Sequence, residues 1–238
     1  MDPEEGLEEI WSEIQNTLTD IIPIYDKGNN IISFGQDTKL RLRGIMKTVK
    51  TGDIVLDLGS GPGTMSHIVL DNIKSIGNIV LLDPLKPMLS VANTKLNDNP
   101  SMMLNGIFEK LPLRDNIFDV VMCGYSFRDA QNFKIAANEM KRVLKNNGRL
   151  LIVDIGKPDN LFLRWFIGLY FRFFAGLLAS FFLGRKGFIF AKIYPTYRKF
   201  LTINQLRNIF QNLFMDVNIE TSMLSAAIIL VAQVPKNK

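Results

Sequence analysis

Two short segments in the first half of the chain constrain its fold more than any other part of the sequence. Val55–Leu58 is an apolar run that contains Asp57 and leads directly into a glycine-rich turn, Gly59–Gly63. About 20 residues later a second apolar run, Ile79–Leu82, ends in Asp83. Apolar runs of this length that alternate with helical patterns are typical of parallel strands. The two segments therefore predict neighbouring parallel strands with a nucleotide-type pocket at their carboxyl ends.

The spacing of the glycines indicates the kind of ligand. A dinucleotide loop follows the pattern Gly-x-Gly-x-x-Gly, which places a pyrophosphate on a helix N-terminus. In Gly59–Gly63 every second residue is glycine, and Pro62 lacks the backbone N–H that a phosphate would need. This favours a nucleoside ligand without phosphate, of which S-adenosylmethionine is the leading case, with Asp83 placed for its ribose. Asp57 either faces the ligand's amino group or binds the backbone of the loop.

The composition is that of a globular protein with one domain, or one domain with an insertion. The 238 residues are 47% apolar and 21% charged, enough to bury a substantial core. One cysteine and one histidine exclude a disulfide framework and argue against a histidine-ligated metal, so no metal is expected. The N-terminus is acidic and lacks the pattern of a signal peptide, which predicts a cytoplasmic location.

The net charge of +5 conceals a strong asymmetry along the chain. Residues 1–26 contain eight acidic side chains and no lysine or arginine. The remainder carries all 28 basic residues against 15 of the 23 acidic ones, a net +13. A basic body can meet nucleic acid, an anionic membrane surface or its own acidic N-terminal segment, and charge alone does not decide among them.

Hydrophobic periodicity predicts a regular alternation of strands and helices after an amphipathic helix over residues 4–22. The expected strands are 53–58, 78–83, 101–105, 117–123, 148–154, 215–220 and 226–234, and the expected helices are 63–76, 86–97, 130–145 and 203–213. This pattern predicts an α/β, Rossmann-like fold with a seven-stranded, mostly parallel sheet, an antiparallel C-terminal edge strand and helices on both faces. We expect an N-terminal helical cap over 1–50, a main domain over 51–238, and an apolar helical insertion at about 157–200.

The insertion is unusually aromatic. Leu161–Phe190 holds nine of the 17 phenylalanines, interrupted by basic residues. Its longest charge-free run, Phe173–Gly184, has 12 residues and would be about 18 Å long as a helix, which is short of the roughly 30 Å of a bilayer core. The segment is therefore not expected to span a membrane. It is either a buried addition to the core or, as the recurring arginines favour, an apolar lid or interfacial element.

Several further segments resemble one family of proteins. The chain is similar to class I S-adenosylmethionine-dependent methyltransferases, and more narrowly it resembles the ubiquinone/menaquinone-biosynthesis C-methyltransferases. Besides the glycine loop, the segments that carry this resemblance are Tyr25–Asn30, Ser33–Gly35, Glu109–Pro112, Asp115–Asp119, Phe127–Asp129, Met140–Leu150, Lys157-Pro158, Tyr194-Pro195 and Phe200. The stretch Arg142–Leu150 is generic to the superfamily, whereas the tyrosine-aspartate segment, Arg128 and Lys157-Pro158 are more specific.

The resemblance implies methyl transfer from S-adenosylmethionine, with S-adenosylhomocysteine as product, to a ring carbon of a polyprenyl hydroxy-aromatic or quinol precursor. The alternatives are another lipid or small molecule, or RNA or protein, although nucleic acid is not the expected partner. Arg128 would stabilise a phenolate or hold a water, and Tyr25 would close over the ligands. The insertion would receive the isoprenoid tail and contact the inner face of the membrane through residues 161–193.

Two positions depart from the family pattern. Ile107-Phe108 stands where relatives commonly offer an Asp or Asn to the adenine amino group, which leaves only the Phe108 backbone N–H for adenine. Asp129 stands where the family has Asn, and it is either the ion-pair partner of Arg128 or a general base. The predicted catalytic residues are Arg128, Asp129 and Tyr25. The predicted cofactor-binding residues are Asp57, Gly59, Ser60, Gly61, Gly63, Thr64, Asp83, Pro84, Ile107, Phe108 and Gly124.

Overall fold

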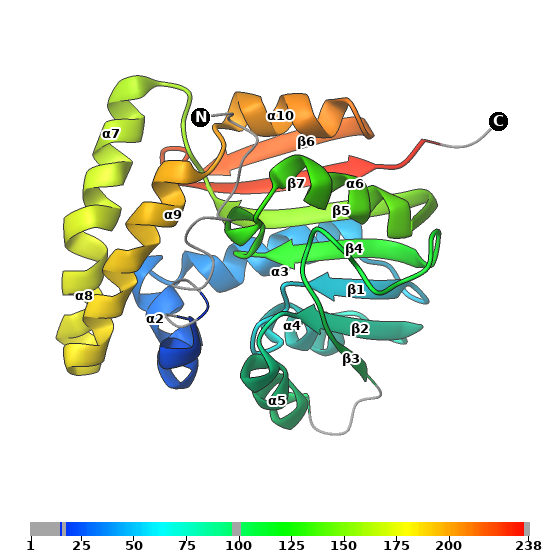
Figure 1. Cartoon of the computed structure of the whole chain (residues 1–238), viewed down its shortest axis with the longest axis horizontal. Helices are drawn as coiled ribbons and strands as arrows, with labels where there is room; N and C mark the ends of the chain where they lie inside the picture. The colour runs from blue at the N-terminus through cyan, green and yellow to red at the C-terminus, as the bar shows by residue number, and fades with distance from the viewer. Residues whose placement is uncertain (1–14, 16–17, 97–100, 236–238) are drawn as a thin grey trace.

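The computed structural model describes residue 15 and residues 18–96 and 101–235, which form a seven-stranded sheet with the order β3-β2-β1-β4-β5-β7-β6 (Figure 1). The strands are β1 (Ile54–Leu58), β2 (Asn78–Asp83), β3 (Ser101–Asn105), β4 (Phe118–Gly124), β5 (Leu144–Ile155), β6 (Met215–Ser222) and β7 (Ala227–Gln233). Strands β1–β5 pair in parallel, and β7 runs antiparallel between β5 and the edge strand β6. The predicted fold class is confirmed, with its antiparallel strand one position inside the edge.

The register of the central strands aligns the two segments that opened the sequence analysis. Leu58 at the end of β1 pairs with Leu82 of β2, so the glycine loop and Asp83 leave the sheet side by side. β1 also pairs with β4, with Asp57 opposite Met122. These central strands are almost completely buried, which explains their nearly continuous apolar sequences.

Helices cover both faces of this sheet (Figure 1). They are α3 (Gln36–Thr48), α4 (Thr64–Asn72), α5 (Lys86–Lys95), α6 (Phe133–Val143) and α10 (Ile203–Gln211). α6 begins at Asn132, whose side chain accepts from two backbone N–H groups, and α10 begins with a capping box at Thr202 and Gln205. The predicted helix over 4–22 lies mostly outside the described residues, but Leu18–Ile21 are helical. The proposed boundary at residue 50 stays a prediction.

The apolar insertion folds as a helical hairpin beside the carboxyl ends of the parallel strands (Figure 1). Its elements are α7 (Leu161–Leu169), η4 (Tyr170–Phe174), α8 (Ala175–Leu183), η5 (Gly184–Lys192) and α9 (Ile193–Lys199). The chain reverses at Gly184, which has a φ of +66° that favours glycine. At Gly187 the second arm comes so close to Ala179 and Ser180 that a Cβ would overlap their backbone.

This insertion is also the one helical stretch, within the part of the chain that the structure describes, that is long and apolar enough to cross a membrane. Leu161–Lys199 has 39 residues, and its most apolar window has a mean hydropathy of 1.8 with 33% of its residues buried. Length and composition alone do not separate a membrane span from a helix that packs on a core. The expectation that the insertion does not span a membrane therefore stays a prediction.

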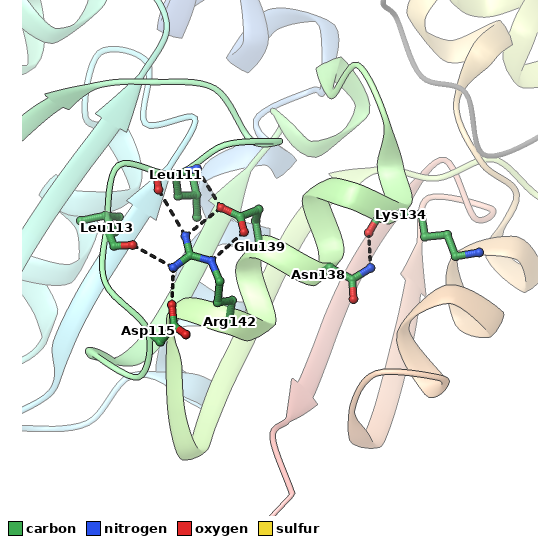
Figure 2. A network of polar contacts seen from close by, with 7 residues as sticks. All are labelled: Leu111, Leu113, Asp115, Lys134, Asn138, Glu139 and Arg142. Atoms are coloured by element: carbon green, nitrogen blue, oxygen red, sulfur yellow. Dashed lines mark hydrogen bonds and ion pairs between the residues drawn. The ribbon is translucent and has the colours of Figure 1, made fainter.

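A polar network holds the loop after β3 against α6 (Figure 2). The Arg142 guanidinium donates to the carbonyl oxygens of Leu111 and Leu113 and pairs with Glu139 and Asp115. Its hydrogen bonds to Glu139 hold the pKa of that carboxyl below its usual range. The network anchors the loop that carries Phe108, and this gives the Arg142–Leu150 stretch a structural role.

Candidate active site

The glycine loop depends on backbone conformations that other residues rarely adopt. Gly59, Gly61 and Gly63 have φ angles of +66°, +54° and +76°. The loop is held to β2 because the backbone N–H of Gly59 donates to the Leu82 carbonyl at 2.8 Å. A Cβ on Gly59 would lie 2.5 Å from the Ser126 hydroxyl, so this glycine is also required by close packing.

Asp83 joins the glycine loop to the start of α5. One carboxylate oxygen accepts from the Gly61 N–H and the other from the Leu85 N–H, both at 2.8 Å. Burial raises the pKa of Asp83 to about 6, against the effect of these two hydrogen bonds. Each carboxylate oxygen has more than one lone pair, so both can still accept from a ligand hydroxyl.

The two carboxylate oxygens of Asp57 have different surroundings. One accepts from the Ser66 N–H at 3.0 Å and the Ser66 hydroxyl at 2.6 Å, whereas the other is buried without a hydrogen-bond partner. Burial raises the pKa of Asp57 to about 6. The first oxygen thus fixes the start of α4 rather than the backbone of the glycine loop, and the second remains available for a ligand.

Arg41, which the sequence analysis did not identify, lies near Asp57. Its side chain comes from α3 and is 2% exposed, yet its Nε and one terminal nitrogen have no hydrogen-bond partner. The guanidinium lies 4.9 Å from the centre of the Tyr125 ring, and its charge partly opposes the rise that burial causes in the pKa of Asp57 and of Tyr25. Buried donors without partners are costly, so Arg41 and the free oxygen of Asp57 are suited to a ligand that carries both charges.

A small cavity of about 40 Å³ lies between the glycine loop, the start of α5 and the N-terminal residues. Its lining residues are Gln15, Leu18, Tyr25, Gly59, Gly61, Asp83, Pro84, Leu85, Met88, Phe108, Ser126 and Asp129. Ligand sites usually have volumes of about 300–1,000 Å³, so this cavity is too small for a nucleoside in this conformation. Gly59, Gly61, Asp83, Pro84 and Phe108 are the predicted cofactor residues that line this cavity.

The other predicted cofactor residues lie behind or beside this lining. The Thr64 hydroxyl donates to Asp26 at 2.7 Å and accepts from Lys95 at 3.0 Å. Ile107 forms an isolated β-bridge, and Gly124 packs tightly on the first turn of α4. Gly63 is the N-cap of α4, and the buried hydroxyl of Ser60 has no partner. Together with Asp57, these predicted cofactor residues do not line the cavity in this conformation.

A second cavity of about 630 Å³ lies between α2 (Tyr25–Ile32), the helical hairpin and the carboxyl end of the sheet. Its walls are mainly aliphatic and aromatic side chains from α7 and η4 and from the turn before β7. The lining residues are Asn29, Ile32, Ser33, Phe34, Asp37, Tyr125, Arg128, Ile155, Phe166, Ile167, Leu169, Tyr170, Phe171, Phe174, Ile193, Met223, Leu224, Ala226 and Ala227. Its volume and apolar walls suit a lipophilic small molecule.

The loop after β4 separates the two cavities. Tyr125 and Arg128 line the large cavity, whereas Ser126 and Asp129 line the small one. The two cavities therefore adjoin at this loop.

Arg128 is held by Asp154, a partner that the sequence analysis missed. A terminal nitrogen of Arg128 donates to one oxygen of the Asp154 carboxylate, and the Arg128 backbone N–H donates to the other, both at 3.1 Å. The Nε of Arg128 is 3.6 Å from an Asp129 oxygen and makes no hydrogen bond. Asp154 is buried within β5.

Asp129 is consequently a buried carboxyl with a weak partner. Burial raises its pKa to about 7, and the charges of Asp154 and Asp83 act in the same direction, while Arg128 opposes them. Burial also raises the pKa of Tyr25. Asp129 is thus within ion-pair distance of Arg128, as one interpretation predicted, but the hydrogen bond of the guanidinium goes to Asp154.

The comparisons with known proteins agree with this geometry. The model of the ubiE/COQ5 methyltransferase family matches residues 7–223. The chain belongs to this family. The predicted family is thereby confirmed.

Three curated proteins illustrate the relationship. The chain is 29% identical to a demethylmenaquinone methyltransferase of Lactobacillus johnsonii over 64% of each chain. It is 32% identical to a ubiquinone/menaquinone biosynthesis C-methyltransferase of Francisella philomiragia, over 63% of this chain and 62% of the relative. It is 29% identical to a 2-phytyl-1,4-naphtoquinone methyltransferase of Synechococcus elongatus, over 66% of this chain and 70% of the relative. The chain thus spans a little under two thirds of the first two relatives.

Solved structures support the fold. A SAM-dependent methyltransferase of Thermotoga maritima superposes with a TM-score of 0.65 at 14% identity, covering 92% of this chain and 99% of that one. A SAM-dependent methyltransferase of Aquifex aeolicus gives 0.58 at 18% identity, covering 87% and 98%. At these identities the likeness establishes the class I methyltransferase fold alone.

Proposed function

We propose that this protein transfers a methyl group from S-adenosylmethionine to a ring carbon of a lipophilic hydroxy-aromatic or quinol precursor in quinone biosynthesis. The observation that carries the proposal is the pair of cavities on either side of the loop after β4. One lies at a glycine loop beside Asp83, and the other is large and apolar with Arg128 in its wall. The family of the chain and the names of its relatives support the same reaction.

The residues around the small cavity suit the cofactor. The buried, unpaired donors of Arg41 complement a carboxylate, and the free oxygen of Asp57 complements an ammonium group. These are the two charges at the amino-acid end of S-adenosylmethionine, and a phosphate ligand would need only the first. Asp83 would accept from the ribose hydroxyls, and Phe108 would pack against the base. When bound, the cofactor supplies an electrophilic methyl group on a positively charged sulfur.

The residues around the large cavity suit the acceptor. A phenol that loses its proton makes the neighbouring ring carbon nucleophilic, and the Arg128 guanidinium stabilises the resulting anion. The new carbon–carbon bond forms as the carbon–sulfur bond breaks, with its electron pair returning to sulfur. The phenol would release its proton to solvent before the transfer, and the proton on the methylated carbon would then pass to a base, for which Asp129 is the candidate. The product phenolate would take up a proton from solvent. The apolar walls receive the isoprenoid tail.

The helical hairpin would bring the lipophilic acceptor from a membrane. Many of its large apolar side chains are exposed, among them Phe181 at 84% and Phe162 at 71%. We therefore propose that residues 161–193 contact the inner face of the cell membrane peripherally, with the rest of the protein in the cytoplasm. Such contact lets the tail enter the cavity without crossing water.

The test combines binding with product analysis. Calorimetry should detect S-adenosylmethionine binding to the purified protein, and the complete absence of binding would contradict the proposal. In cells that lack the gene, mass spectrometry of the quinone pool should show accumulation of the unmethylated precursor. An Arg128→Ala variant should fail to restore the methylated quinone, whereas wild type restores it. An unchanged pool in the deletion strain would reject the quinone precursor as substrate.

A further inference from the structure

A third cavity lies on the hairpin, and we propose that it binds the headgroup of an anionic phospholipid. It has a volume of about 430 Å³ and lies between α7, η4 and α9. Its lining residues are Lys157, Leu161, Arg164, Trp165, Gly168, Leu169, Arg172, Phe173, Tyr194, Tyr197 and Arg198. Four of these are cationic and none is acidic, so the cavity is built for a negative charge.

The cations come together without acidic partners. In the part of the chain that the structure covers, no carboxylate forms an ion pair with Lys157, Arg164, Arg172 or Arg198. Asp159 is the only acidic residue between positions 155 and 200, and its carboxylate accepts from the Asn204 N–H. A cluster of like charges is unfavourable unless an anion compensates it.

Two of the cations are held in place by backbone carbonyl groups. The Lys157 amine donates to the carbonyl oxygens of Arg198 and Phe200 at 2.8 and 2.6 Å. The Arg164 guanidinium donates to those of Pro158 and Asp159, both at 2.9 Å. Burial, and then the charge of the nearby Arg164, lower the pKa of Lys157 to about 8. The positions of both cations are therefore defined before any ligand binds.

The other two cations leave room for a ligand. Arg172 lies over the rings of Phe173 and Tyr194, at 5.1 and 5.6 Å from their centres, so its edge remains free to hydrogen-bond a phosphate. Arg198 lies on the opposite arm of the hairpin. A phosphate between the two arms would meet guanidinium groups from both sides, in the arrangement that arginine provides for phosphate recognition.

Exposed apolar side chains around this cavity favour a lipid over a soluble phosphate compound. Leu161 is 74% exposed, Trp165 63% and Phe173 49%, and all three line the cavity. A soluble anion would leave this apolar rim in water. A phospholipid places its phosphate on the cations and its acyl chains along the rim, as at other membrane interfaces.

The position of this cavity also connects it to the proposed acceptor site. Leu169 lines both the headgroup cavity and the large apolar cavity. A bound headgroup would therefore orient the hairpin so that the acceptor cavity lies next to the bilayer. This consequence rests on the proposed function, whereas headgroup binding itself does not.

Vesicle co-sedimentation tests the site. Wild type should bind vesicles of phosphatidylcholine mixed with phosphatidylglycerol more tightly than vesicles of phosphatidylcholine alone. An Arg172→Gln/Arg198→Gln variant should lose more than the roughly 30-fold that diffuse attraction alone predicts for two basic residues at about 1 kcal/mol each, because each guanidinium also hydrogen-bonds the phosphate. The matched control is Arg185→Gln/Lys186→Gln, which removes the same charge from the same hairpin outside the cavity. The control should lose several-fold less.

Each other outcome overturns the proposal. Equal losses in the two variants would mean diffuse attraction to the membrane, and equal binding to both kinds of vesicle would mean no headgroup site. Competition by inorganic phosphate at concentrations that leave vesicle binding of the control intact would assign the cavity to a free anion. If the double variant does not fold, Arg198→Gln alone replaces it, because that change breaks no ring contact.

The same variants separate this inference from the proposed function. Arg172→Gln/Arg198→Gln should retain wild-type affinity for S-adenosylmethionine and wild-type methylation of a short-tailed, soluble acceptor. If the wild type bound anionic vesicles but not S-adenosylmethionine, the headgroup site would stand and the proposed reaction would fail.

Discussion

The candidate active site has a cofactor side, around the glycine loop and the small cavity, and an acceptor side, around the large apolar cavity. These two sides are built in different ways. The cofactor side depends on backbone geometry, with three glycines at positive φ and the Asp83 carboxylate tying their loop to α5. The acceptor side depends on side-chain volume, with apolar walls from the hairpin and few polar groups. A ligand of one invariant shape can be matched by a rigid loop, whereas a flexible isoprenoid tail needs only an apolar space of sufficient size.

The charged residues follow the same division. On the cofactor side, the N-terminal residues Leu18 and Tyr25 line a cavity of only about 40 Å³. On the same side, the buried Arg41 guanidinium has two nitrogens without hydrogen-bond partners, and its charge acts on Asp57. On the acceptor side, Arg128 is already paired with Asp154 and borders about 630 Å³. On the proposed function, the cofactor side rearranges to accept its ligand, while the acceptor side is largely formed.

The largest loss of activity is expected from replacing Arg128, which lies at the boundary between the cofactor side and the acceptor side. Arg128→Ala should lower kcat by about 10²–10³-fold, because it removes the charge that stabilises the developing phenolate. Affinity for S-adenosylmethionine, measured by calorimetry, should change little, since Arg128 lines only the acceptor cavity. Asp154→Asn should reproduce part of the loss by releasing the guanidinium. If Arg128→Ala abolished cofactor binding and left kcat intact, the assignment of the two sides would be reversed.

A smaller effect, on S-adenosylmethionine binding, is expected from replacing Asp83 on the cofactor side. Asp83→Asn should weaken S-adenosylmethionine binding by about 10- to 100-fold, because a hydrogen bond to a charged group contributes about 1.5–3 kcal/mol. Thr64→Val is the matched control. Thr64 was also predicted to bind the cofactor, but its hydroxyl contacts Asp26 and Lys95. A larger loss in Thr64→Val than in Asp83→Asn would place the cofactor deeper than the cavity described here.

The pH dependence of turnover tests Asp129. As a base it acts when deprotonated, so kcat should rise with pH and level off above about 7, the raised pKa of this carboxyl. Asp129→Asn should lower kcat by about 10²-fold or less at the plateau and remove this rise. A wild-type profile that is flat between pH 5 and 8 would contradict a base with this pKa.

The raised pKa of Asp129 affects the stability of the fold in the direction opposite to its effect on turnover: stability falls as the pH rises. Between its ordinary pKa of 3.8 and about 7, the folded protein holds a proton on Asp129 that the unfolded chain has lost. The contribution of Asp129 to the free energy of unfolding therefore falls as pH rises through this window. Denaturant unfolding of Asp129→Asn should show a weaker decrease with pH than wild type. An identical pH dependence in both proteins would mean that Asp129 ionises normally.

Much of this architecture could be predicted from the sequence, because it depends on local patterns. The strand that leads into Gly59, the strand that ends in Asp83 and the apolar hairpin each follow from residues close together in the chain. The pairing of Arg128 with Asp154 could not be predicted, since 26 positions separate the two residues and only the β4–β5 register brings them together. An acid within the apolar run of β5 was the available signal.

Arg41, in the helix α3, is a second residue whose position in the site could not be predicted from the sequence. An arginine between the apolar positions Leu40 and Ile45 has the spacing of an exposed residue as readily as a buried one. Only the packing of α3 on the sheet reveals that its guanidinium is buried and unpaired. In the same way, Thr64 follows the glycine loop directly, yet the fold directs its hydroxyl toward Asp26.

The smallest effect is expected where the N-terminal residues cover the cofactor cavity. Ile21, Tyr25 and Met88 form a small hydrophobic cluster of their own, apart from the main core, with Leu18 packed against it. If this cluster must open before the cofactor binds, the closed state reduces the apparent affinity. Ile21→Ala should therefore tighten S-adenosylmethionine binding by about two- to fivefold, mainly through faster association in stopped-flow measurements. Ile135→Ala, an exposed change on α6, should have no effect. If Ile21→Ala instead weakened binding and sped up dissociation, the cluster would close over the bound cofactor, and the cofactor side would be preformed like the acceptor side.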